Sequence, residues 1–179
     1  MPVDGGPARQ LTRGATESRF LAWSPDGSEL VKEGDGLVVV PVQGGRERRL
    51  TDEMGDGYSD WSPDGRWVAF QRTRDGTTRL WRIPAAGGTP EPLIDGEGRT
   101  PRWSIDGKWI YFIGIGDRRN NIWGLSLESR EVRPVTALDG RGGALGLLGL
   151  ATDGRFLYFT WEESRSDIWA ADIVQPPDK

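Results

Sequence analysis

Short apolar runs, bounded by polar and glycine-rich segments, follow one another along the chain. Three of them come shortly after an Asp-Gly pair and cover residues 67–70, 109–113 and 156–159. Apolar and polar residues do not alternate within these runs, so both faces of each strand are expected to be buried. The pattern predicts β-strands in sheets that each pack between two other sheets.

Two further kinds of strand are predicted in each unit. One follows a polar turn and is largely apolar, at residues 37–41, 80–84, 122–125 and 168–171. The other is polar or contains proline, at residues 46–51, 90–94 and 131–136. Charge and proline keep an exposed edge strand from pairing with other chains. This last strand is therefore predicted to form the outer rim.

A five-residue segment, Trp-Ser-Pro-Asp-Gly, marks the start of each unit. It occupies residues 23–27 and 61–65, returns with one change at 103–107, and has a diverged copy at 150–154. The four copies start 38, 42 and 47 residues apart. A period that drifts around forty residues fits four short strands per unit, joined by loops of variable length.

Turn chemistry explains the repeated segment. Ser, Pro, Asp and Gly suit the four successive positions of a type I turn, and the preceding Trp is expected to anchor the corner in the core. Recurrence at a fixed phase favours turn and packing roles over ligand binding. The residues assigned to these structural roles are Trp23, Asp26, Gly27, Trp61, Asp64, Gly65, Trp103, Asp106, Gly107, Asp153 and Gly154.

The repeat predicts an all-β fold, a β-propeller of four four-stranded antiparallel blades in one domain spanning residues 1–179. The predicted blades cover residues 13–51, 52–94, 95–136 and 137–173, followed by a tail at 174–179. Residues 1–12 match residues 40–51, so residues 7–12 are expected to be an outer strand. We expect this strand to complete the C-terminal blade, either in its own chain or in a partner chain.

The repeat resembles the TolB-like family of β-propellers. Repeats of that family carry a Pro-Asp-Gly turn after a Trp and an Ile-Trp pair in the third strand, as at residues 122–123 and 168–169. The likeness covers roughly residues 3–173. It implies the fold and says little about activity, because the family includes periplasmic translocation proteins, appendages of bacterial kinases and regulators, and propellers attached to peptidases.

Family members usually have six or more blades, whereas this chain has material for four. Three arrangements follow from that difference. The four blades close alone, two chains pair as half-rings in a homodimer, or the chain is a piece of a longer propeller protein. The sequence leaves the compartment of the chain open between the bacterial periplasm and the cytoplasm.

Composition removes several classes of function. The net charge is −4, and no dense Lys or Arg cluster is present, which argues against nucleic-acid binding. The chain has no Cys and no His, so disulfides, thiol chemistry, the commonest zinc ligand and a serine triad are all excluded. No apolar run is long enough to cross a bilayer, so no membrane partner is expected. No cofactor is expected either.

The candidate binding residues lie on the predicted first strand of each blade, which lines the central channel of a propeller. Arg19 and Arg99 stand four residues before a repeat Trp, Tyr58 stands three before, and Asp60 and Arg102 stand directly before. Arginines at equivalent positions suit a partner that carries carboxylates. The sequence therefore predicts a non-catalytic scaffold that binds a protein or peptide at the channel mouth.

Two alternatives remain open at this point. Oxygen ligands suit calcium, and Asp52, Glu53, Asp56 and Asp60 form an acidic cluster, although a solvated loop is the favoured interpretation. A propeller enzyme of the lyase or lactonase type, using central carboxylates and a cation, is one alternative function. The other is a purely structural fragment that assembles into a ring.

Overall fold

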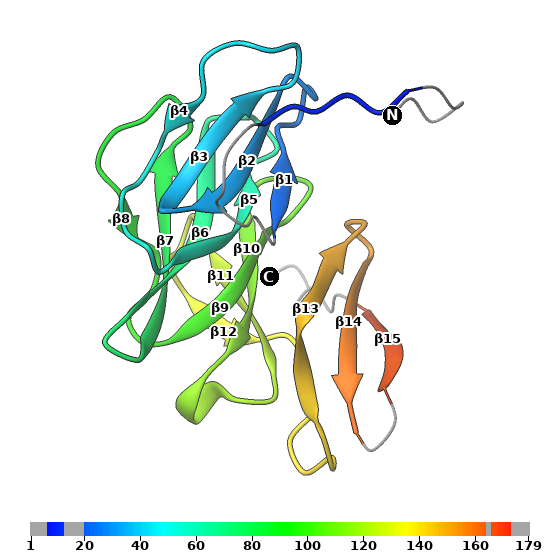
Figure 1. The fold of residues 1–179 in the computed structure, drawn as a ribbon. Coiled ribbons are helices and arrows are strands. Elements are labelled where there is room, and N and C mark those ends of the chain that lie inside the picture. The colour runs from blue at the N-terminus through cyan, green and yellow to red at the C-terminus, as the bar shows by residue number, and fades with distance from the viewer. Residues whose placement is uncertain (1–6, 13–19, 164–165, 173–179) are drawn as a thin grey trace.

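A computed structural model of the chain describes residues 7–12, 20–163 and 166–172 (Figure 1). The first sheet contains β1 (Leu21–Trp23), β2 (Glu29–Gly34), β3 (Gly36–Pro41) and β4 (Arg48–Arg49). The second contains β5 (Asp56–Trp61), β6 (Trp67–Arg74), β7 (Thr77–Pro84) and β8 (Glu91–Pro92). The third contains β9 (Gly98–Trp103), β10 (Trp109–Gly114), β11 (Ile122–Ser126) and β12 (Val132–Pro134). The fourth contains β13 (Ala144–Thr152), β14 (Phe156–Glu162) and β15 (Ser166–Asp172).

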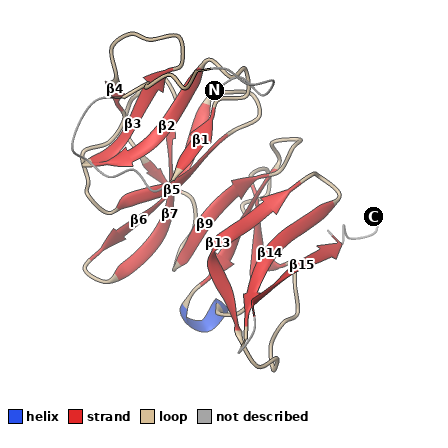
Figure 2. Cartoon of the chain, turned by 45° about the vertical axis from the view of Figure 1, so that its right-hand side comes forward, coloured by secondary structure: helices blue, strands red, loops and turns tan. Residues whose placement is uncertain are grey.

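Each sheet is an antiparallel meander, with strands in sequence order from the inner to the outer edge. The inner strands contact one another in succession: β1 lies against β5, β5 against β9, and β9 against β13. The four sheets are therefore arranged as blades of an arc (Figures 1 and 2). Within the described ranges, the first and fourth blades make no extended contact with each other. The predicted propeller architecture is confirmed.

The repeated segment forms the predicted tight turn. In the second blade, the Ser62 hydroxyl donates to Asp64 Oδ1 (2.6 Å), and the same Asp64 oxygen accepts the N–H of Arg66 (3.0 Å). The N–H of Gly65 closes the turn on the Ser62 carbonyl oxygen (2.9 Å). These bonds recur in the first and third blades, and Asp153 caps the diverged turn of the fourth. The Asp residues are thus held by the turn itself.

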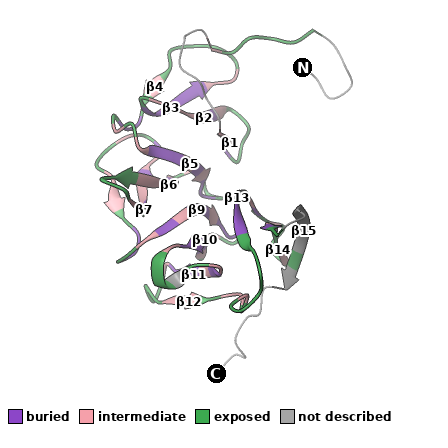
Figure 3. Cartoon of the chain, turned by 60° about the horizontal axis from the view of Figure 1, so that its bottom comes forward, coloured by how far each residue is buried: buried purple, intermediate pink, exposed green. Residues whose placement is uncertain are grey.

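Packing between blades forms three separate apolar clusters. One blade presents the small and branched residues of its second and third strands, and the next blade presents the Trp that precedes its turn. Trp61 and Trp103 are buried in this way in the first and second clusters. Leu150 replaces the Trp in the third cluster, beside Leu157 and Phe159. Buried stretches on β3, β5 and β13 appear in purple in Figure 3. Both faces of the middle blades are covered, as the unbroken apolar runs predict.

The outer edges differ from the prediction in two respects. The outer strands are shorter than their predicted ranges, and β8 and β12 end at Pro92 and Pro134, which have no N–H to donate. Residues 7–12 form no strand, and Arg9 bonds instead to the carbonyl oxygen of Val42 in the first blade. Among the described residues the fourth sheet has three strands, and residues 7–12 do not pair with it. Completion by a partner chain remains a prediction.

None of the helical structure in the described part of the chain is long and apolar enough to span a membrane. The one short 3-10 helix described, Gly116–Arg118, lies in the loop between β10 and β11.

Candidate functional site

Two of the predicted channel residues, Asp60 and Arg102, join one blade to the next. They occupy the same repeat position on β5 and β9, directly before the Trp. Asp60 Oδ2 accepts the backbone N–H of Trp103 (2.7 Å), and Arg102 Nε donates to the carbonyl oxygen of Leu150 (2.8 Å). Both side chains therefore satisfy backbone groups of the following inner strand. These hydrogen bonds between blades were not predicted. They mean that the bonded atoms of Asp60 and Arg102 stabilise the fold.

The environment of Asp60 shifts its protonation. Burial between the blades raises the pKa of this carboxyl from 3.8 to about 6, while Arg102 and the N–H of Trp103 oppose the shift. A raised pKa means that the folded chain binds this proton more tightly than the unfolded chain. The contribution of Asp60 to stability is therefore greatest at acidic pH, and it declines as pH rises through the interval from about 4 to 6.

Asp60→Asn should remove this part of the pH dependence, because Asn keeps an acceptor for the Trp103 N–H and does not titrate. We expect the free energy of unfolding to depend less on pH between about 4 and 6 in the variant than in the wild type. Urea unfolding at both pH values measures it. The exposed Asp75→Asn serves as control. Equal pH dependence in wild type and Asp60→Asn would show that Asp60 does not titrate as described.

The inner strands β5 and β9 share a β-bulge, two residues before Asp60 and Arg102. Tyr58 on β5 and Thr100 on β9 both have positive φ, at 50° and 54°. The N–H of Tyr58 donates to Glu33 Oε1 (2.5 Å), and the N–H of Thr100 donates to Gln71 Oε1 (3.1 Å). In each case the acceptor belongs to the preceding blade. A side chain of one blade thus accepts the backbone N–H at the bulge of the next blade. The bulge points the Tyr58 side chain in a different direction from that of a regular strand.

Tyr58 and Arg99 form the remaining part of the predicted site. The Tyr58 ring stacks on Phe20, with ring centroids 4.0 Å apart. Arg99 Nη2 donates to the Leu145 carbonyl oxygen (3.1 Å), and its Nε has no hydrogen-bond partner in the described part of the chain. Burial lowers the pKa of Arg99, and nearby Tyr58 and Glu162 oppose that change. We call Phe20, Tyr58 and Arg99 the inner-face cluster.

The sequence prediction was only partly informative about this site. Arg19 lies outside the described residues. Phe20, Glu33 and Gln71 were not predicted, yet each has a repeat signal. Phe20 stands three residues before a repeat Trp, as Tyr58 does, and Glu33 and Gln71 each stand ten residues after one.

The acidic cluster at residues 52–56 surrounds an arginine. Both oxygens of the buried Asp56 are bonded by Arg72, at 2.6 and 2.8 Å. The same carboxylate, with Glu53 and Asp52, raises the pKa of Arg72. Among residues 7–12, 20–163 and 166–172, no three acidic, His or Cys side chains lie close enough to hold a metal ion. Both oxygens of the Asp56 carboxylate therefore already accept hydrogen bonds from Arg72.

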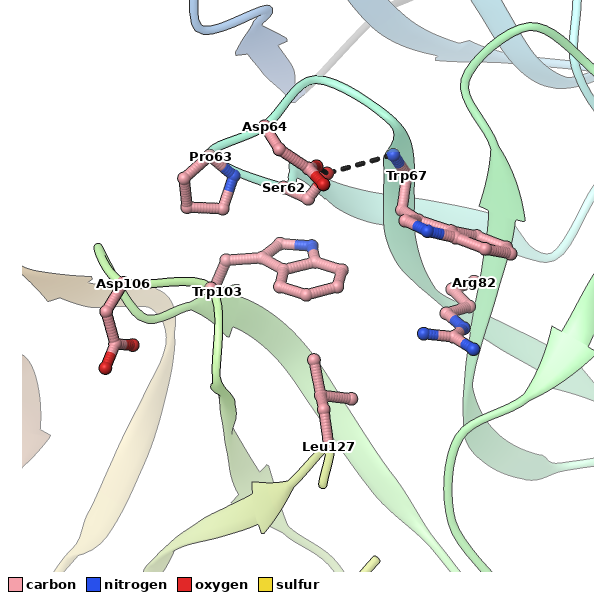
Figure 4. A pocket seen from close by; sticks show the side chains of 9 residues that line it. Ser62, Pro63, Asp64, Trp67, Arg82, Trp103, Asp106 and Leu127 are labelled. Atoms are coloured by element: carbon pink, nitrogen blue, oxygen red, sulfur yellow. Dashed lines mark hydrogen bonds between the residues drawn. The ribbon is translucent and has the colours of Figure 1, made fainter.

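Grooves also lie between neighbouring blades on the side of the repeated turns. The groove between the second and third blades has a volume of roughly 480 Å³ and is lined by the Asp64 turn, Trp103 and Arg82. Figure 4 shows the Trp103 ring between this turn and Leu127. The Arg82 guanidinium stacks over Trp67, 4.1 Å from the ring centroid, and bonds to Glu91. The Trp and Arg side chains that line this groove therefore already contact other residues of the two blades.

Comparisons with known proteins agree on the fold. The family model described as TolB beta propeller domain matches residues 14–173. An uncharacterized protein of Agrobacterium fabrum is 34% identical over 102 residues, which are 53% of this chain and 34% of that protein. A structure of TolB from Acinetobacter baumannii superposes with a TM-score of 0.81 at 19% identity, covering 96% of this chain and 45% of its own.

Two other solved structures extend the comparison. A structure assigned as TolB, from Agrobacterium tumefaciens, gives a TM-score of 0.76 at 24% identity, over 92% of this chain and 61% of its own. An oligogalacturonate lyase in complex with manganese gives 0.67 at 18% identity, over 91% of this chain and 52% of its own. These identities show the fold alone. The chain spans less than two thirds of the length of each of these proteins.

Proposed function

This chain belongs to the TolB β-propeller domain family, and from that premise we propose that it is a non-catalytic scaffold whose inner face holds a protein or peptide. In this proposal the four blades form part of a larger ring, because the first and fourth described blades are not in extended contact. The inner strands then line a channel, and the inner-face cluster lies on that lining.

The observation that carries the proposal is the inner-face cluster. The half-buried rings of Phe20 and Tyr58 stack, and the half-buried Arg99 on the next inner strand interacts electrostatically with Tyr58. Tyr and Arg are the residue types that contribute most where proteins bind one another. The Arg99 guanidinium has five N–H donors, more than its bond to Leu145 uses, and a carboxylate is the group that matches such a fork. A partner with an aromatic or aliphatic side chain next to a carboxylate would fit both parts.

The inner strands favour binding over catalysis. Directly before the Trp position, the four blades carry Ala22, Asp60, Arg102 and Gly149. An enzyme that works through a central cation needs several inward carboxylates from different blades. Only one of these four residues is acidic, and it bonds to the N–H of Trp103. The residues present support a scaffold.

Selection from a random peptide library, with the full chain as bait, tests the proposal. We expect the selected peptides to contain carboxylates beside apolar residues. Arg99→Gln and Tyr58→Asn should each weaken their binding at least about tenfold, because each removes one half of the cluster. Asn tolerates the positive φ of Tyr58, so this variant removes the ring without straining the backbone.

The exposed Arg46→Ala is the matched control, and it should bind the selected peptides as the wild type does. Isothermal titration calorimetry gives the affinities. The proposal would be overturned if the library yields no binder, or if the selected peptides bind both cluster variants with unchanged affinity.

A lyase-type or lactonase-type propeller enzyme is the second candidate, and the fold likeness to a manganese-bound oligogalacturonate lyase favours it. A cation that binds the folded chain raises its melting temperature with concentration. The scaffold proposal predicts no shift with Mn²⁺ or Ca²⁺ at millimolar concentration. A saturable rise that Asp60→Asn abolishes would support the enzyme instead.

A further inference from the structure

One end of the arc exposes a tryptophan that its repeat partners bury. Trp61 and Trp103 are 6% and 7% exposed, whereas Trp23, at the same repeat position, is 57% exposed. Leu21, two residues earlier on the same face of β1, is also exposed. The opposite face of the first blade packs on the second blade through Val31, Leu37 and Val39. Leu30 and Val40 pair beside Trp23 on this face and are buried, so the exposed part of this interblade surface consists of Leu21 and Trp23.

The other end of the arc exposes the complementary surface. Val31, Ala69 and Tyr111 occupy one repeat position, and each is buried against the following blade. Tyr158 holds this position in the fourth blade and is 37% exposed, with its hydroxyl bonded to Asp153. Leu157 and Phe159 face the third blade, so Phe156 and Tyr158 lie together on the outer face.

The three interfaces inside the chain show what covers each surface. The Trp of one blade lies against the turn of the preceding blade: Trp61 and the first-blade residues Pro25 and Asp26 line one groove. Trp103 has the same relation to Pro63 and Asp64. By this rule, the occupant of the Trp23 surface is a blade that offers a turn ending in Asp-Gly and an apolar second strand. The fourth blade, with Asp153, Gly154 and Tyr158, offers both and has no blade against it in the described chain.

We propose that the fourth blade of a second copy of this chain packs on the Trp23 surface, head to tail, as a fourth interblade interface. The contact joins two different surfaces, so it is heterologous and gives a ring if the rotation closes or a longer assembly if it does not. It involves none of the inner-face cluster and does not depend on the proposed binding function.

Light scattering over a range of concentrations tests the assembly. The wild type should exceed the single-chain mass of 19.8 kDa and include species of at least two chains at high micromolar concentration. Trp23→Ser and Tyr158→Arg should each weaken association at least about tenfold, because each removes one of the two surfaces. Met54→Ser removes an exposed apolar side chain outside the two surfaces and should associate as the wild type does.

Mixing the two variants gives the sharpest result. Trp23→Ser keeps an intact fourth-blade surface, and Tyr158→Arg keeps an intact first-blade surface. An equimolar mixture should therefore form a two-chain species and stop there, although neither variant associates alone. Both residues are exposed, and an unchanged urea transition confirms that each variant is folded.

Three outcomes would overturn the proposal. The first is a wild-type mass of one chain at every concentration, which would leave the Trp23 surface to further blades of a longer polypeptide or to another protein. The second is association that persists in Tyr158→Arg and is lost in Trp23→Ser, which indicates a symmetric contact between two Trp23 surfaces. The third is a mixture of the variants that stays monomeric.

Discussion

Replacing Phe112 with alanine is expected to lower the free energy of unfolding by about 3–5 kcal/mol, the range for deleting a buried aromatic ring. Phe112 is fully buried in the cluster between the second and third blades, with Leu80 and Leu93. Its ring lies directly against Gly98, where a Cβ would be 2.7 Å from Phe112 Cδ2. Because β-sheets on both sides are fixed by their hydrogen bonds, the cavity has little room to collapse.

Urea unfolding followed by tryptophan fluorescence measures this loss. Ile105→Ala is the control, because Ile105 is more than half exposed at the neighbouring turn and should cost far less. A loss below about 1 kcal/mol for Phe112→Ala would mean that the interblade cluster is not the close-packed core described.

Gly36→Val is expected to destabilise the chain by about 3 kcal/mol or more, from steric overlap and backbone strain together. Gly36 has φ +102°, and a Cβ there would lie 2.2 Å from the carbonyl oxygen of Thr51. Thr51 cannot easily retreat, because its hydroxyl accepts the N–H of Leu37 (2.9 Å). The substitution therefore separates the outer strand from the third strand of the first blade.

Gly65→Val separates the two causes. Gly65 closes the repeated turn with φ +70°, but the nearest atom to an added Cβ is Pro25 Cδ at 3.9 Å. We expect about 1–3 kcal/mol from strain alone, clearly less than for Gly36→Val. Thermal and urea unfolding of both variants give the comparison. Equal losses would contradict the steric explanation for Gly36.

The repeated turn and the strand pattern were enough to predict the blades. Ser62, Pro63, Asp64 and Gly65 form a turn through bonds within five residues, so local chemistry is sufficient to recognise it. The unbroken apolar runs predicted sheets covered on both faces, and Val68 and Phe70 are indeed fully buried. These features depend on neighbours in sequence and on period, and both can be read from one chain.

The polar contacts between blades could not be predicted in the same way. The sequence predicted that Asp60 binds a partner in the channel. In the structure its carboxylate accepts the backbone N–H of Trp103, 43 residues later. Gln71 accepts the backbone N–H of Thr100, 29 residues later. Such contacts depend on the angle between neighbouring sheets and on the bulge at Tyr58 and Thr100. Neither feature can be predicted from a local sequence pattern. The same limit applies to residues 7–12, where repeat matching predicted a strand that this chain does not form.

Hydrogen exchange at the Thr100 amide tests most directly the central claim, that side chains of one blade satisfy the backbone of the next. In the wild type this buried N–H donates to Gln71 Oε1 and should exchange slowly. Gln71→Ala should speed its exchange at least about tenfold, although Gln71 lies in the preceding blade, while the exposed Gln43→Ala leaves it unchanged. A Thr100 exchange rate that is the same in wild type and Gln71→Ala would contradict the account.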